Sequence, residues 1–205
     1  TNDPIEQCLL PVDISKRIIY LIGDSHASNH VGSIDLAVRK FPDLEFHYLV
    51  EWGFIGSLSG VTKCKDNSKR PCIDDSFDKH MEFVRKNVKP GDMVIFSWAR
   101  DSVVYEGSIP RKPNYSALRI LKDKLIEMRS VVTSRGAHLV LVDDIPKPCN
   151  DQDWSIIYST GRHEICSTTM GVSKEDRRPL TGLYGSLVSD KVHYFDPHDS
   201  LCTQG

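Results

Sequence analysis

The sequence lacks the long apolar run of a membrane-spanning helix, and it carries little net charge. No stretch of its 205 residues approaches the ~20 consecutive apolar residues that cross a bilayer. The 26 basic and 28 acidic residues nearly cancel, which leaves a formal charge of −2. A chain without a strong field of either sign has no general attraction to nucleic acid or to an anionic membrane. These absences argue against an integral membrane chain and against a nucleic-acid partner, and the length suits one domain.

The common cofactor and metal motifs are missing as well. The chain contains neither a G-x-x-x-x-G-K-[ST] loop nor a G-x-G-x-x-G turn, the two glycine-rich motifs that hold nucleotide phosphates. It has no C-x-x-C pair, and no H-x-x-x-H spacing is combined with a carboxylate. We therefore expect no metal and no cofactor.

The six cysteines all fall outside the strongly apolar, periodic segments. Free cysteine prefers the core, so six cysteines in loops and chain ends favour three disulfides and an oxidising compartment. We expect pairs that each close one loop, Cys64–Cys72 and Cys149–Cys166, with Cys202 bonded to Cys8 or to a cysteine outside this sequence. The alternative is a cytosolic flavodoxin-like domain with reduced thiols.

Five short apolar runs rich in Val, Ile and aromatic residues predict strands. Each run is nearly continuous in hydrophobicity, as in parallel strands that are buried on both faces. The runs are Ile18–Ile22, Phe46–Val50, Met93–Ser97, His138–Val142 and Val192–Phe195.

Apolar residues at helical spacing lie between most of these runs. The stripes span Val31–Phe41, Phe77–Val88 and Leu118–Val132; Pro90-Gly91 ends the second helix, and Gly136 ends the third. Alternating strands and helices predict an α/β fold with three α/β/α layers and a mostly parallel five-stranded sheet. Residues 51–74 read as a long loop, and residues 144–190 as a cysteine-tied insertion with at most one short helix.

The sharpest chemical signal is Gly23-Asp24-Ser25-His26-Ala27, directly after the first predicted strand. A serine at a strand-to-helix turn is exposed at the sheet edge, close to backbone N–H groups that can stabilise an oxyanion. With a neighbouring base, its hydroxyl becomes a nucleophile. The alternative is that Asp24 or Ser25 only caps the following helix.

The Gly23–Ala27 segment resembles the first sequence block of the SGNH (GDSL-like) hydrolases. The similarity is to the variant fused to the C-terminus of acyltransferase-3 type membrane O-acyltransferases. It continues in order along nearly the whole chain, through Trp52 to Cys72, Trp98-Ala99-Arg100 and Val142 to Pro146. The last matching segment, Phe195 to Cys202, carries Asp-Pro and Leu-Cys. The first block and this last segment are specific, and the correspondences between them are loose.

The resemblance implies that Ser25 is a nucleophile attacking an acyl ester. The backbone N–H groups of Ser25 and Gly53 would form the oxyanion hole. This chain departs from the pattern because it has no D-x-x-H after its last strand and no Asn after the third. We therefore expect residues 1–205 to be a single SGNH-like domain that lacks its C-terminal D-x-x-H segment. His198, which follows the last strand, is the candidate base within this sequence.

Four further residues of these segments are candidates for supporting roles. Asp24 is expected to support the turn by accepting backbone N–H bonds. His26, next to Ser25, could line the pocket. Arg100 could bind a substrate oxygen or form a salt bridge, and Trp98 could stack on a sugar or belong to the core.

Together these features predict an extracytoplasmic domain that transfers or removes an acyl group, with acetyl as the expected group, on a carbohydrate hydroxyl through an acyl-enzyme at Ser25. Its partners would be a glycan acceptor and an upstream membrane acyltransferase domain that donates acyl groups and tethers it. The competing hypothesis is a catalytically incomplete SGNH-like module that binds glycans.

Overall fold

The structure, a computed structural model, describes six segments of the chain. These are residues 16–24, 26–50, 74–98, 105–106, 112–143 and 170–197. All six cysteines lie outside them, so the expected disulfides stay a prediction. No helix in the described segments is both long and apolar enough to cross a membrane.

The five predicted strands form one sheet, in which every neighbouring pair is parallel. Its strand order is β2-β1-β3-β6-β7, so the first strand lies inside the sheet and the chain crosses over it. The strands are β1 (Arg17–Gly23), β2 (Leu44–Val50), β3 (Met93–Ser97), β6 (His138–Val142) and β7 (Val192–Phe195). This confirms the predicted sheet, and the boundaries agree within two residues.

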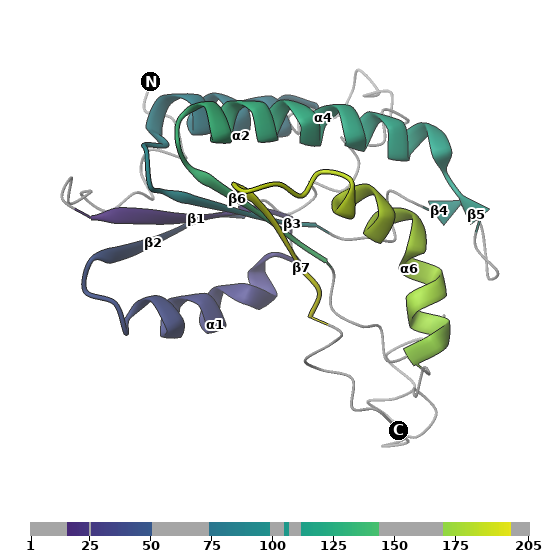
Figure 1. Ribbon diagram of the computed structural model, residues 1–205, viewed down its shortest axis with the longest axis horizontal. Helices are drawn as coiled ribbons and strands as arrows, with labels where there is room; N and C mark the ends of the chain where they lie inside the picture. Colours follow the sequence, from purple (N-terminus) through teal and green to yellow (C-terminus); the bar gives the residue numbers. More distant parts are fainter. Residues whose placement is uncertain are drawn as a thin grey trace, which may run out of the picture.

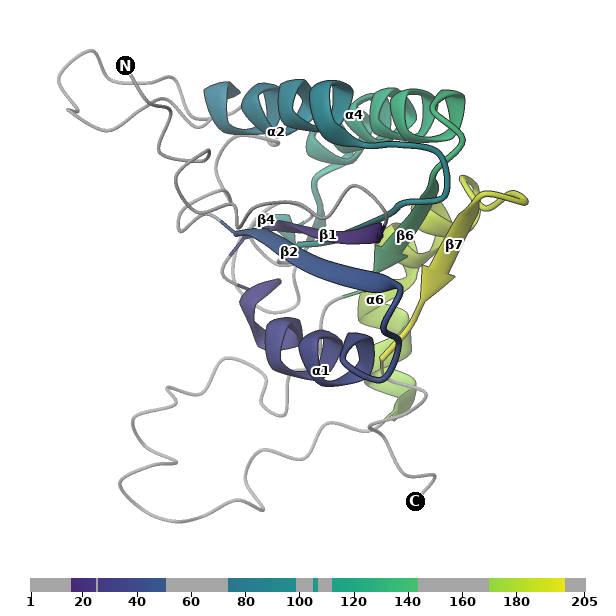
Figure 2. The ribbon, with the colours of Figure 1, turned by 90° about the vertical axis from the view of Figure 1, so that its left-hand side faces the viewer.

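In the described segments, four helices pack against the sheet (Figures 1 and 2). Helices α2 and α4 lie side by side on one face, and α1 lies on the other. Their bounds are α1 (Ser28–Val38), α2 (Asp74–Asn87), α4 (Tyr115–Ser134) and α6 (Met170–Gly185). The three-layer α/β/α prediction is therefore confirmed. A small antiparallel pair, β4 (Tyr105–Glu106) and β5 (Lys112–Pro113), was not predicted.

Helix α4 begins and ends for identifiable local reasons. The side chain of Asn114 accepts a hydrogen bond from the N–H of Ala117 at 2.9 Å and so caps the first turn. After the last turn, Gly136 has φ +79°, a left-handed conformation that glycine adopts without a steric penalty. The sequence had predicted this stop.

Helix α6 is longer than the sequence predicted. It runs for 16 residues with Pro179 inside it, where at most one short helix was expected. The charged run Lys174–Arg178 and the proline hide its amphipathic pattern in the sequence. Its second half buries Leu180 and Tyr184 in the core, where Leu187 joins them just after the helix ends, and this packing stabilises the helix.

The two faces of the sheet carry hydrophobic cores of very different size. On the α2/α4 face, 24 buried residues form one cluster, to which α6 contributes. On the α1 face, the described residues form a cluster of four buried side chains, Leu21, Ala27, Ile95 and Val142. Most of the hydrophobic stabilisation therefore comes from one side of the sheet.

A buried carboxylate joins the strands at their amino-terminal ends. Asp92, 2% exposed, accepts hydrogen bonds from the N–H groups of Ile18 and Lys89, both at 2.8 Å. Its carbonyl oxygen also accepts from the N–H of His138 at 2.9 Å. One residue thus links β1, the turn before β3, and β6.

We expect Asp92→Ala to lower the free energy of unfolding by about 3 kcal/mol, because the buried N–H of Ile18 and the part-buried N–H of Lys89 both lose their carboxylate acceptor. For a domain of this size the melting temperature should fall by roughly 9 °C, measurable by circular dichroism. Asp190→Ala, at an exposed turn, is the matched control and should change the stability by less than about 0.5 kcal/mol. Equal melting temperatures for the two variants would contradict the assigned role of Asp92.

Candidate functional site

Buried polar residues gather at the carboxyl ends of the three central strands. Asp24 follows β1, Ser97 ends β3 and Asp143 follows β6, and each is 0% exposed. Because these strands are parallel neighbours, the three residues share one edge of the sheet. Ligands of open α/β sheets bind at this edge.

The turn after β1 begins where two strands approach each other closely. Gly23 pairs with Ser97 in the register of β1 and β3. A Cβ atom at Gly23 would lie 1.8 Å from the carbonyl oxygen of Ser97 and 2.7 Å from the Cβ of Ala27. No other residue fits here without moving the backbone, so the glycine sets the path of the chain into the turn.

The buried Asp24 stabilises the turn by accepting hydrogen bonds from backbone N–H groups. Its Oδ1 accepts a hydrogen bond from the N–H of His26 at 2.9 Å, and its carbonyl oxygen accepts from the N–H of Ala27 at 3.0 Å. Such a side-chain bond to the backbone two residues ahead is an Asx turn. Helix α1 starts afterwards, with Ala27 at its N-cap position and no side-chain cap bond there. Asp24 therefore orders the turn itself, and the cap position belongs to Ala27.

Asp143 is held by groups from two other elements. It accepts a hydrogen bond from the hydroxyl of Tyr194 in β7 at 2.8 Å, and the hydroxyl of Thr181 in α6 lies 3.5 Å away. Burial, and next the negative charge of Asp143, raise the pKa of Tyr194 well above its usual range. The tyrosine hydroxyl therefore stays protonated and donates, which ties the end of β7 to the end of β6.

The proposed substrate-binding residues differ in what the structure shows of them. Trp98 is 2% exposed, belongs to the larger core cluster and has its ring centroid 6.3 Å from that of Phe96. This burial favours the core over a sugar-stacking surface, the two alternatives that the sequence left open. His26 is half-buried at the turn.

Several predicted site residues lie outside the described segments. They are the candidate nucleophile Ser25, the oxyanion donor Gly53, Arg100 and the candidate base His198. Their roles stay predictions. Although His26 and His30 are four residues apart, the described parts of the chain contain no group of three or more potential metal ligands.

The sequence analysis did not single out Asp143, Tyr194 or Ser97. Asp143 could have been found, because it is a carboxylate directly after a buried strand. Tyr194 could not, because its partner is 51 residues away in sequence. In the sequence, nothing distinguishes Ser97 from the other residues of its strand. In the described structure, its buried hydroxyl has no hydrogen-bond partner.

Comparisons with known proteins agree with this geometry. The family described as "SGNH domain (fused to AT3 domains)" matches residues 1–205. Among solved structures, the periplasmic domain of a lipopolysaccharide acetyltransferase from Salmonella ser. Paratyphi A aligns with a TM-score of 0.62 at 14% identity. The alignment covers 93% of this chain and 69% of that chain.

A second solved structure, from Corynascus thermopiles (Myceliophthora fergusii), is a carbohydrate esterase family 2 enzyme with a carbohydrate-binding domain. It aligns at 15% identity with a TM-score of 0.46, over 91% of this chain and 58% of that chain. Of these two likenesses, the first is close enough to support the fold. No protein of curated function matches the sequence.

We expect Gly23→Ala to destabilise the protein by about 3 kcal/mol or more, because the new methyl group overlaps the Ser97 carbonyl oxygen. Gly32→Ala is the matched control: it lies in α1 with nothing within 4 Å of its Cβ position, and should stabilise by about 0.5–1 kcal/mol. Urea unfolding of both variants measures the difference. If Gly23→Ala is as stable as the wild type, the close approach of the two strands is not a constraint.

Proposed function

Because the chain belongs to the family of SGNH domains that are fused to AT3 domains, we propose that it is a serine-dependent O-acyl transferase or esterase. In this proposal Ser25 accepts an acyl group, most simply acetyl, in exchange with a carbohydrate hydroxyl, which either donates the group or receives it. The proposal rests above all on the turn from Gly23 to Ala27, which brackets Ser25.

The fixed residues on either side of Ser25 support a role as nucleophile. Gly23 is confined by the backbone of β3, and Asp24 is buried and bonded to the N–H of His26. Ser25 thus stands between two anchored residues, and α1 begins three residues later. The partial positive charge at the start of this helix favours the oxyanion of an acyl-transfer intermediate.

The reaction has two balanced steps. The Ser25 Oγ attacks the carbonyl carbon of an acyl ester, and its proton passes to a general base. The tetrahedral intermediate collapses, the ester bond breaks, and the leaving alkoxide takes that proton. An acceptor hydroxyl or water then gives its own proton to the base and attacks the carbonyl carbon of the acyl-enzyme. The bond between the acyl group and Ser25 Oγ breaks, and the base returns the proton to Oγ.

Other residues would assist these steps. The backbone N–H groups of Ser25 and Gly53 would donate to the oxyanion, and Arg100 and His26 would contact the substrate. The base would be His198, or a histidine of a D-x-x-H segment that follows this sequence. Asp24 would act through the turn, by positioning Ser25.

The AT3 domains to which members of this family are fused suggest the cellular location of the domain and the source of its acyl group. We place the domain outside the cytoplasm, tethered to a membrane acyltransferase domain that supplies the acyl group. A glycan or polysaccharide would be the acceptor, by analogy with the structurally similar domain of a lipopolysaccharide acetyltransferase. How well the pocket excludes water decides between transfer and hydrolysis.

One observation favours a second function. The sequence contains no D-x-x-H after β7, and an SGNH-like domain without an acid and base could still bind a glycan. In that case the domain would present carbohydrate to a partner enzyme and turn over no ester.

We expect Ser25→Ala in the full-length protein to reduce hydrolysis of 4-nitrophenyl acetate by at least about a thousandfold, since the proposed acyl-enzyme forms on the Ser25 hydroxyl that the variant lacks. Ser130→Ala, an exposed serine on α4, is the control and should retain full activity. Rapid quenching and peptide mass spectrometry should find an acetyl group on the peptide that contains Ser25.

The outcomes separate the two functions. Loss of turnover and of the acetylated peptide in Ser25→Ala alone supports the enzyme. A wild-type protein that turns over no ester but binds polysaccharide supports the binding module. Equal activity of wild type and Ser25→Ala would exclude the proposed acyl-enzyme.

A further inference from the structure

Two histidines from neighbouring strands meet on one face of the sheet. The Nδ1 atom of His138 in β6 lies 3.3 Å from the Nε2 atom of His193 in β7. The two ring planes are inclined by 17°, and the ring centroids are 5.6 Å apart. Because these nitrogens are closer together than the centroids, they face each other in the space between the rings.

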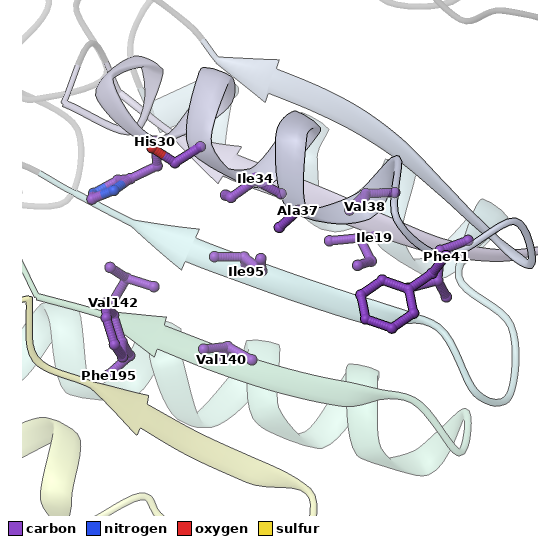
Figure 3. Close-up of a pocket in the computed structure, with 12 residues that line it drawn as sticks. Ile19, His30, Ile34, Ala37, Val38, Phe41, Ile95, Val140, Val142 and Phe195 are labelled. Atoms are coloured by element: carbon purple, nitrogen blue, oxygen red, sulfur yellow. The ribbon is translucent and has the colours of Figure 1, made fainter.

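The histidine pair is on the accessible side of the sheet. Figure 3 shows Val140 of β6 and Phe195 of β7 lining the apolar groove between α1 and the strands. Side chains alternate along a strand, so His138 and His193, each two residues earlier, lie on this same face. The contact between the two rings is exposed, which lets a dissolved ion reach both nitrogens.

Each imidazole has the other ring as its polar side-chain partner in the described part of the chain, where neither forms an ion pair with a carboxylate. A separation of 3.3 Å is longer than most hydrogen bonds from N–H groups, which span about 2.7–3.2 Å, so a direct bond between the rings is weak. A neutral imidazole keeps its proton on one nitrogen and offers the lone pair of the other. The arrangement therefore presents two imidazole nitrogens that can act as metal ligands.

We propose that His138 and His193 bind one zinc ion between them, with water in the two remaining positions. Tetrahedral zinc has Zn–N distances of about 2.0–2.1 Å, which separate two nitrogen ligands by about 3.3–3.4 Å. The observed 3.3 Å matches this spacing. Neighbouring nitrogens of a square-planar Cu²⁺ site would be about 2.8–3.0 Å apart at the same bond length. A small tilt of each exposed ring turns its lone pair toward the ion.

The site differs from those that the sequence motifs describe. The two ligands are 55 residues apart in sequence, so no local spacing reveals them, and the expectation of no metal rested on such spacings. Two protein ligands leave the ion open to water and exchangeable. His138 begins β6, roughly 16 Å of strand before Asp143 at the carboxyl edge. The inference therefore concerns a different part of the domain and does not rest on the proposed function.

Chemical modification of the full-length protein tests the site at single residues. Diethyl pyrocarbonate modifies imidazole nitrogens, and a nitrogen bound to zinc cannot react. We expect zinc chloride to protect His138 and His193 together by at least about tenfold in rate, measured by peptide mass spectrometry. Modification of His30, on α1, is the internal reference and should not change. Magnesium chloride should protect neither ring, because Mg²⁺ prefers oxygen ligands.

A stability measurement tests whether the two histidines act as one site. Zinc that binds the folded chain but not the unfolded chain raises the melting temperature, and the pair is assembled only by folding. We expect zinc to raise the melting temperature of the wild type by several degrees, and His138→Gln and His193→Gln each to abolish this rise. His30→Gln is the matched control and should keep it.

The outcomes decide the proposal. Joint protection of both rings, lost at either one when the other is replaced by glutamine, supports a shared ion. Equal modification with and without zinc overturns the proposal. So do equal protection by magnesium, protection of His193 that persists in His138→Gln, and a zinc-dependent rise in melting temperature that is the same in all variants.

Discussion

The close approach of Gly23 and Ser97 determines the geometry of the whole carboxyl edge. The carbonyl oxygen of Ser97 occupies the space of a side chain at Gly23, so β1 can leave the sheet along one path only. The buried Asp24 then fixes the next turn through the N–H of His26. The backbone from Gly23 into the start of α1 is therefore held on both sides of position 25 by contacts with its neighbours.

The fold distributes its stability unevenly around this edge. The α2/α4 face holds the large core, whereas α1 covers the other face with a small one. The turn from Gly23 to Ala27 leads into α1, the helix on the side of the sheet with the smaller buried cluster.

The strands could be predicted because each is a short apolar run, independent of distant residues. In the central strands β1, β3 and β6 this follows from burial on both faces, whereas the edge strands β2 and β7 keep the apolar run with part of it exposed. Helix α6 was underestimated, because Pro179 and a charged run conceal a pattern that tertiary packing stabilises. Asp92 is a single carboxylate whose partner Ile18 lies 74 residues away in sequence, and no local pattern reveals it. Asp143 follows a buried strand directly, but its partner Tyr194 is 51 residues away and could not be foreseen. For the site, the sequence supplied Gly23–Ala27, but the steric reason for the glycine appears only when β1 and β3 lie side by side.

Asp92 lies at the edge opposite the turn, where one carboxylate and one carbonyl oxygen fasten β1, β3 and β6. The register of the sheet is thereby set at its amino-terminal end. The segments beyond the carboxyl ends can then differ in length and composition without shifting any strand. Exchanging those segments between related domains should therefore leave the strand order and register unchanged, provided that the graft keeps the Asp92 junction intact.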